Sequence, residues 1–163
     1  MRRLVVALLA ALFGGVAGCA PAGMSPPDAS PACASADVTQ IDPPADGGAA
    51  SSDVGKIVAR SCALGGCHAG SPGAADLTLP VDSGAWVANL VNRRSRENPA
   101  LMLVEPGEPE RSWMVHKLTG DFCSLASTCT SQLGCGLRMP LGSPLPADDI
   151  MTIFLWVRAG APR

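Results

Sequence analysis

The sequence is organised around the stretch Cys62-Ala63-Leu64-Gly65-Gly66-Cys67-His68. It places two thiols close together, with an imidazole directly after the second one. Covalent haem attachment requires this set, because each sulfur can add to a vinyl group of the ring and the adjacent ring nitrogen can reach the iron. The common attachment motif has two residues between its cysteines, whereas this stretch has four. The two glycines allow backbone conformations closed to other residues, which a longer loop needs to bring both sulfurs to one ring edge.

The residues before this stretch have the pattern of an amphipathic helix. Val54, Ile57 and Val58 fall at positions i, i+3 and i+4, so they share one helical face. Ser52 or Asp53 is placed to cap the first turn. We therefore expect a helix that ends where the cysteine stretch begins.

Three later segments also have helical patterns, separated by turns rich in proline and glycine. The first covers residues 85–91 and is capped by Asp82 or Ser83. The second begins after Ser112, which caps it. The third begins at Pro146 and stops at Gly160. The residues expected to face inward are Met114, Val115 and Leu118 in the second, and Ile150, Ile153, Phe154 and Val157 in the third. The predicted fold class is mainly α, a small helical domain with long loops over residues 53–163.

Residues 1–18 have the pattern of an export signal, with two arginines before an apolar run that is too short to span a bilayer. The Val-Ala-Gly sequence before Cys19 resembles the lipobox of bacterial lipoproteins. That resemblance implies cleavage before Cys19 and acylation of its thiol. The alternative is an ordinary secretory signal. We expect a protein anchored by lipid in the bacterial cell envelope, and Ala20 is compatible with the outer membrane, facing the periplasm.

Residues 19–52 are rich in proline, alanine and serine, and they cannot bury enough apolar surface to fold alone. We expect them to form a disordered tether between the lipid anchor and the folded domain. Cys33 is the one cysteine within the tether after the lipidated Cys19.

The six cysteines that remain without Cys19 are expected to be bonded in an oxidising compartment. If haem takes Cys62 and Cys67, the others form two disulfides among Cys33, Cys123, Cys129 and Cys135. Alternatively, Cys62 and Cys67 pair with each other. A metal site that uses Cys67, His68 and further thiols is a third interpretation, which the oxidising compartment disfavours.

Composition argues against two classes of function. The formal charge is −2 and no basic cluster is interleaved with aromatic residues, so nucleic acid is not an expected partner. The chain has two histidines, and no Ser-His-Asp or Glu-His pairing is suggested by local spacing, so we do not expect an enzyme. The cluster Arg93-Arg94-Arg96 is interpreted as a solvated helix end, with docking of an acidic partner as the alternative.

The order of these parts resembles a known family. The chain has a helix leading into a Cys…Cys-His stretch, then Met139-Pro140, then a last helix ending in Trp156-Val157-Arg158-Ala159-Gly160-Ala161-Pro162. This order is similar to that of the class I cytochrome c domain. It is especially similar to the cytochrome c-like domains of planctomycete and myxobacterial exported proteins. In those domains a Met-Pro segment, a short helix and a Trp-x-x-x-Gly-Ala ending recur. The resemblance covers roughly residues 54–162.

The resemblance implies a haem c, with its iron, as a covalent cofactor. Cys62 and Cys67 would be the thioether anchors, His68 the proximal iron ligand and Met139 the distal one. The implied function is one-electron transfer between redox proteins of the bacterial envelope. Met114 and His116 are the alternative distal ligands. The alternative function is a haem-free, disulfide-braced lipoprotein that acts as a binding or spacer module.

Overall fold

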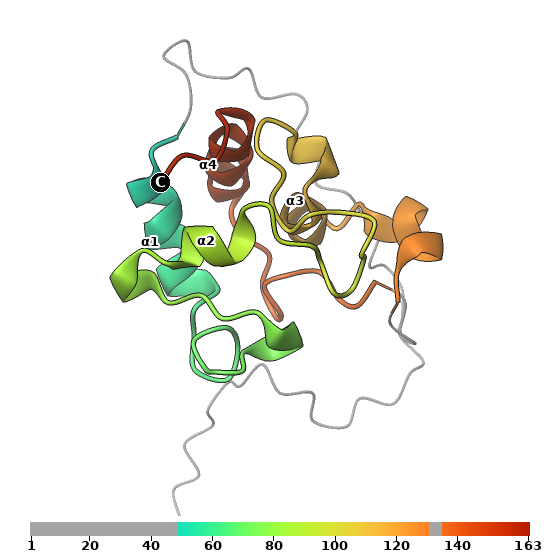
Figure 1. Cartoon of the computed structure of the whole chain (residues 1–163), viewed down its shortest axis with the longest axis horizontal. Helices are drawn as coiled ribbons and strands as arrows, with labels where there is room; N and C mark the ends of the chain where they lie inside the picture. Colours follow the sequence, from blue (N-terminus) through green and yellow to red (C-terminus); the bar gives the residue numbers. More distant parts are fainter. Residues whose placement is uncertain (1–48, 131–134) are drawn as a thin grey trace, which may run out of the picture.

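A computed structural model describes residues 49–130 and 135–163 of the chain. In these residues the protein is mainly helical, which confirms the predicted fold class. The helices are α1 Ser51–Ser61, α2 Trp86–Leu90, α3 Trp113–Thr119 and α4 Ala147–Arg158, and short 3-10 turns join them: η1 Ala74–Asp76, η2 Val81–Ser83, η3 Pro109–Arg111 and η4 Phe122–Thr128 (Figure 1). The predicted signal 1–18, the predicted lipidation site Cys19 and Cys33 lie outside the described residues.

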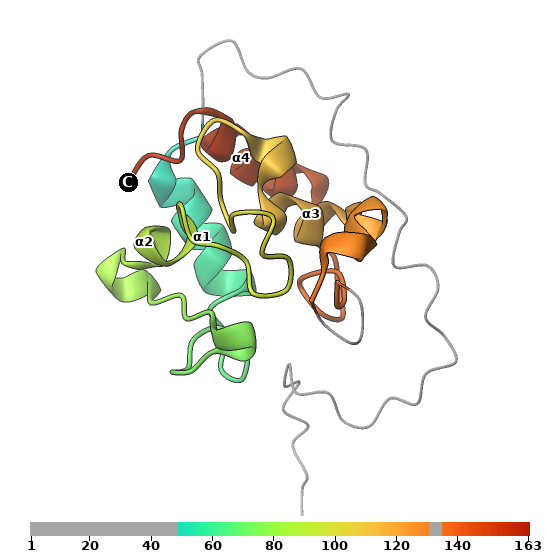
Figure 2. The same ribbon diagram turned by 45° about the vertical axis from the view of Figure 1, so that its right-hand side comes forward.

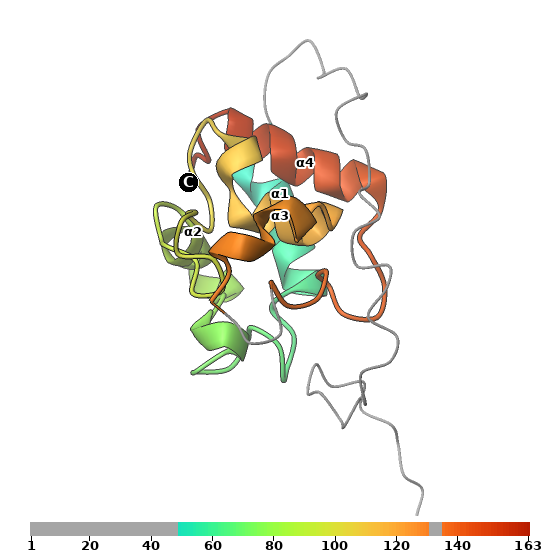
Figure 3. The same cartoon turned by 90° about the vertical axis from the view of Figure 1, so that its right-hand side faces the viewer.

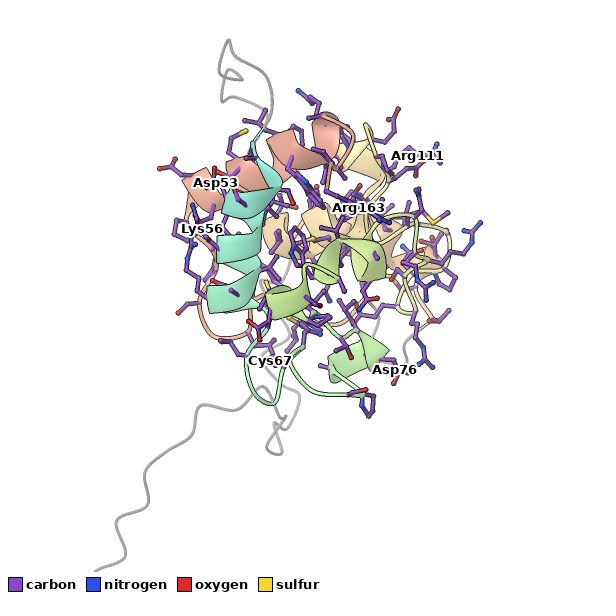
Figure 4. The ribbon with its side chains drawn as sticks, turned by 60° about the vertical axis from the view of Figure 1, so that its left-hand side comes forward. Asp53, Lys56, Cys67, Asp76, Arg111 and Arg163 are labelled. Atoms are coloured by element: carbon purple, nitrogen blue, oxygen red, sulfur yellow. A yellow bond between two sulfur atoms is a disulfide. The ribbon has the colours of Figure 1, made fainter. Side chains whose placement is uncertain are left out.

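Helix α1 packs against α4, and the predicted apolar face of α1 is the one that is buried. Val54, Ile57 and Val58 are at most 3% exposed. The cap prediction was wrong, because the helix begins at Ser51 after Ala50 and no side chain caps it. Asp53 instead pairs with Lys56 at 2.8 Å on the exposed side of α1, where Figure 4 shows both residues.

Helix α4 lies across α1 and α3 (Figure 3). All of its predicted inward-facing residues are buried: Ile150, Ile153, Phe154 and Val157. Gly160, in the left-handed region with φ +94°, follows the helix end as predicted. Trp156 is fully buried, with its ring centroid 5.4 Å from that of Trp86 and its Nε1–H donating to the carbonyl of Pro162 at 2.9 Å.

The predicted caps of α2 and α3 were also wrong. Ser112 stands directly before α3, but its hydroxyl accepts from the Glu105 amide at 2.9 Å and donates to the Glu108 carbonyl at 2.9 Å. It therefore closes the turn before the helix instead of capping it. Before α2, the Ser83 hydroxyl accepts from the amide of Ala85, which precedes the first helical residue.

A second, smaller apolar cluster lies beside α3. Trp113, Phe122 and Cys135 are buried there. Within the predicted cysteine-rich loop, a disulfide joins Cys129 to Cys135, and Cys123 is disulfide-bonded as well. The disulfide thus joins the end of the 3-10 helix η4 to the start of the described segment that leads into α4.

Among the helices of residues 49–130 and 135–163, none has the length and apolar character needed to cross a bilayer.

Replacing Trp156 by alanine should lower the free energy of unfolding by about 3–5 kcal/mol, because a fully buried indole and its hydrogen bond are lost. Chemical denaturation followed by circular dichroism measures this. Leu137→Ala is the control, since Leu137 is 58% exposed and its loss should cost no more than about 0.5 kcal/mol. Equal losses in the two variants would contradict the assignment of the core.

Candidate functional site

A cavity of about 390 Å³ lies between the loop after α1, the segment before α3 and the start of α3. Ligand cavities in proteins have volumes of roughly 300–1,000 Å³. Cys62, His68 and Met139 all line it. The structure therefore brings together three of the four residues predicted from the sequence to hold a haem.

Cys62 stands at the end of α1, where its amide donates to the Val58 carbonyl at 2.9 Å. Its thiol is free, so the alternative in which Cys62 and Cys67 pair with each other was wrong. Burial raises the pKa of the Cys62 thiol to about 11, an effect that the nearby positive charge of Arg60 reduces only in part. The sulfur is therefore protonated at neutral pH.

Cys67 differs from Cys62 in both position and chemical state. It is 8% exposed, it does not belong to the cavity wall, and its sulfur is disulfide-bonded. Figure 4 shows it on the loop that follows α1. Of the two glycines in this loop, Gly66 takes the left-handed conformation with φ +82°.

His68 is held by hydrogen bonds on both its ring and its backbone. Nδ1 lies 3.0 Å from the carbonyl oxygen of Leu77, and the His68 carbonyl accepts from the Leu79 amide at 2.7 Å. Because a carbonyl oxygen only accepts, Nδ1 carries the proton in the neutral ring, which leaves the lone pair on Nε2. Metal-binding histidines are commonly oriented by this kind of bond from the second ring nitrogen.

Two methionines line the cavity, and both are fixed through their backbone amides. The amide of Met139 donates to the carbonyl of Lys117 at 2.8 Å, and that of Met114, in the first turn of α3, donates to the carbonyl of Leu103 at 3.0 Å. The predicted distal ligand, Met139, and its alternative, Met114, therefore both border the same space.

His116, the other alternative, lies outside the cavity wall. Its Nδ1 lies 2.7 Å from a carboxylate oxygen of Asp121 and its Nε2 lies 3.0 Å from the carbonyl oxygen of Glu110. Both partners only accept, so both ring nitrogens donate and no lone pair is left for a metal. Partial burial lowers the pKa of His116, but the hydrogen bond and charge of Asp121, together with Glu110, outweigh this and raise it. His116 is therefore not a candidate ligand.

The cavity walls are mostly apolar. Their larger apolar side chains are Leu77, Leu79, Leu90, Leu103, Trp113 and Leu118. They come from the loop after α1, the end of α2, the segment before α3 and α3 itself, so an apolar group in the cavity could contact hydrocarbon from several segments.

Three arginines add positive charge to the same cavity. Arg93, Arg94 and Arg96 all line it, with Arg96 paired to Asp76 and Arg94 donating to the Pro99 carbonyl at 2.9 Å. All three are exposed, so the prediction that they are solvated is confirmed. The predicted helix end was wrong, because α2 ends at Leu90 and the arginines follow on an irregular segment. No short-range signal in the sequence indicates that this segment turns toward the cysteine loop.

A buried ion pair forms another part of the wall. The Lys117 ammonium, with its side chain 7% exposed, lies 3.2 Å from the Glu97 carboxylate. Burial lowers the pKa of Lys117, and the charge of Glu97 opposes this only in part. This pair could not be predicted from the sequence, because Lys117 occupies one position of an otherwise ordinary amphipathic helix.

No protein-family model matches the chain, and no curated protein and no solved structure matches it either. Within the described ranges, no three His, Cys, Asp or Glu side chains come together as a metal-ion site of the kind considered for Cys67 and His68.

Replacing Asp121 by asparagine should lower the pKa of His116, because the carboxylate that favours the imidazolium is removed. In the native protein this pair stabilises the fold fully below the unfolded pKa of about 6.5, and the stabilisation is lost as the pH rises through the raised folded pKa. Histidine NMR titration measures the first effect, with the His68 signal as the internal control. Denaturation at several pH values measures the second, and an unchanged pKa in the variant would contradict it.

Proposed function

We propose that this protein is a monohaem c-type cytochrome of the bacterial cell envelope, which binds haem in the cavity and transfers single electrons. The observation that carries the proposal is that Met139, which is distant in sequence, borders the same cavity as Cys62 and His68 of the cysteine stretch. The orientation of His68 supports it, since the Leu77 carbonyl leaves Nε2 with the lone pair.

The cavity lining suits the shape and charge of a haem. The leucines and Trp113 offer apolar contacts to the faces of the ring. The three arginines offer charge-assisted hydrogen bonds to its two carboxylate groups. An amphiphilic ring with acidic side groups therefore matches this site better than a wholly apolar or a wholly polar ligand.

His68 and Met139 would hold the iron, and Met114 is the alternative to Met139. When bound, haem supplies an iron that gains and loses one electron, and an imidazole with a thioether raises its potential. The apolar side chains of the lining would lower the polarity around a bound haem. We propose no catalytic role for any of these residues.

Cys62 is the sulfur best placed for covalent attachment. In this reaction the S–H bond adds across a vinyl C=C bond, so a C–S bond forms and the hydrogen goes to the second carbon, with no net oxidation. Cys67 is disulfide-bonded, so its attachment first requires a thiol reductant. A haem held by Cys62 alone needs no such reductant.

The cellular setting rests on the sequence. The export signal and the lipobox-like sequence before Cys19 support a lipid anchor, in the outer membrane facing the periplasm, with the tether of residues 19–52 holding the domain away from the lipid. The partners would be redox proteins of the envelope.

The oxidised cysteines favour a second candidate function, a haem-free binding or spacer lipoprotein. Cys67 and Cys123 are disulfide-bonded and Cys129 is bonded to Cys135. Such bonds stabilise a small domain without any cofactor.

Protein exported from a strain able to attach c-type haem should show a pyridine haemochrome spectrum and an intact mass that includes one haem. Cys62→Ala should lose most of the haem that survives denaturation, whereas His116→Gln, outside the cavity wall, should keep it. Haem retained in Cys67→Ala would mean that one thioether suffices. A colourless native protein whose mass shows only disulfides would establish the haem-free alternative.

Met139→Ala should open one iron position, so that the reduced protein binds carbon monoxide almost completely. Met114→Ala is the matched control, because it removes the other thioether that borders the cavity, and it should bind none. Difference spectra of the reduced protein measure this. Binding of carbon monoxide by Met114→Ala and not by Met139→Ala would mean that Met114 is the distal iron ligand.

A further inference from the structure

The segment that carries Met139 has no regular secondary structure, yet Lys117 fixes it at two points. The Lys117 ammonium donates to the Cys135 carbonyl at 2.8 Å, and the Lys117 carbonyl accepts from the Met139 amide at 2.8 Å. Arg138 adds a third bond, from its Nε to the Leu118 carbonyl at 2.8 Å. Figure 2 shows this chain segment beside α3. The segment that carries Met139 is therefore held in place by hydrogen bonds to residues of α3.

The side chain of Lys117 has little freedom to move. Its Nζ lies 3.2 Å from Glu97 Oε2, and 5.7 Å and 5.1 Å from the ring centroids of Trp113 and Phe122. The same carboxylate oxygen accepts from Trp113 Nε1 at 3.0 Å, which fixes Glu97 in turn. A buried ammonium without its partners is costly, so these contacts restrict the lysine to one place.

Gly136 allows the ion pair to approach the backbone of the segment. Its φ is +72°, and a Cβ at this position would lie 2.9 Å from Glu97 Oε1 and 3.1 Å from Lys117 Nζ. Any other residue would be strained and would press on both charged groups. The glycine and the ion pair therefore fit together as one unit.

We propose that Lys117 is the positioning residue for Met139. Its ammonium, paired with Glu97, holds the Cys135 carbonyl, while its own carbonyl holds the Met139 amide, so the Met139 thioether is kept at the cavity. The inference rests on the proposed function insofar as that thioether is an iron ligand. The placement of the segment itself does not depend on haem.

The first test uses the haem-free full chain and amide hydrogen exchange. In Lys117→Leu, peptides covering residues 135–139 should exchange at least about tenfold faster relative to α4 peptides, because the local contacts are lost. Lys56→Leu is the control, since Lys56 is the other lysine and lies exposed on α1. Equal acceleration in α4 and in residues 135–139 would mean a general loss of stability and would overturn the proposal.

Gly136→Ala keeps both charged residues and guards against a Lys117 variant that does not fold. It should accelerate exchange in the same segment, because its Cβ would displace the ion pair. Unchanged exchange there would overturn the proposal as well.

The second test uses the haem-loaded protein. Lys117→Leu should weaken the red charge-transfer band of a ferric histidine–methionine haem and let the reduced protein bind carbon monoxide, as expected of Met139→Ala. An intact band would overturn the positioning role. If the native chain takes up no haem, the proposed function fails, and the exchange experiment alone decides the role of Lys117.

Discussion

The packing of α1 against α4 is the constraint on which the other parts depend. Valine and isoleucine side chains of α1 are buried against α4, and Trp156 of α4 packs against Trp86. An ion pair from Arg60 to Asp149, at 2.5 Å, joins the end of one helix to the start of the other. Because α1 is fixed in this way, the loop that starts at Cys62 emerges at a defined point on the cavity wall.

Helix positions were predictable from the sequence because hydrophobic periodicity is a local property. The inward faces of α1 and α4 were both correct, since burial of a regular apolar stripe dominates their energetics. The caps were wrong because a hydroxyl such as that of Ser112 has several backbone partners within reach. The structure selects among them through the turn before the helix.

The sequence indicated three residues that the structure places around one cavity, but it did not indicate what surrounds them. Cys62, His68 and Met139 were identified because few residue types bind iron or attach to haem. The arginines and the Lys117–Glu97 pair were missed because their positions depend on how distant segments fold together. The disulfide bonding of Cys67 could not be predicted from the number of cysteines. Six cysteines can all be bonded whether Cys67 binds haem or forms a disulfide.

The burial of Cys62 limits how readily its thiol reacts with disulfides. Thiol–disulfide exchange proceeds through the thiolate, and a pKa of about 11 leaves almost none at neutral pH. Folding therefore shelters one reduced sulfur while Cys67, Cys123, Cys129 and Cys135 are oxidised. Among the described cysteines, the fold itself therefore determines which one keeps a free thiol for later chemistry.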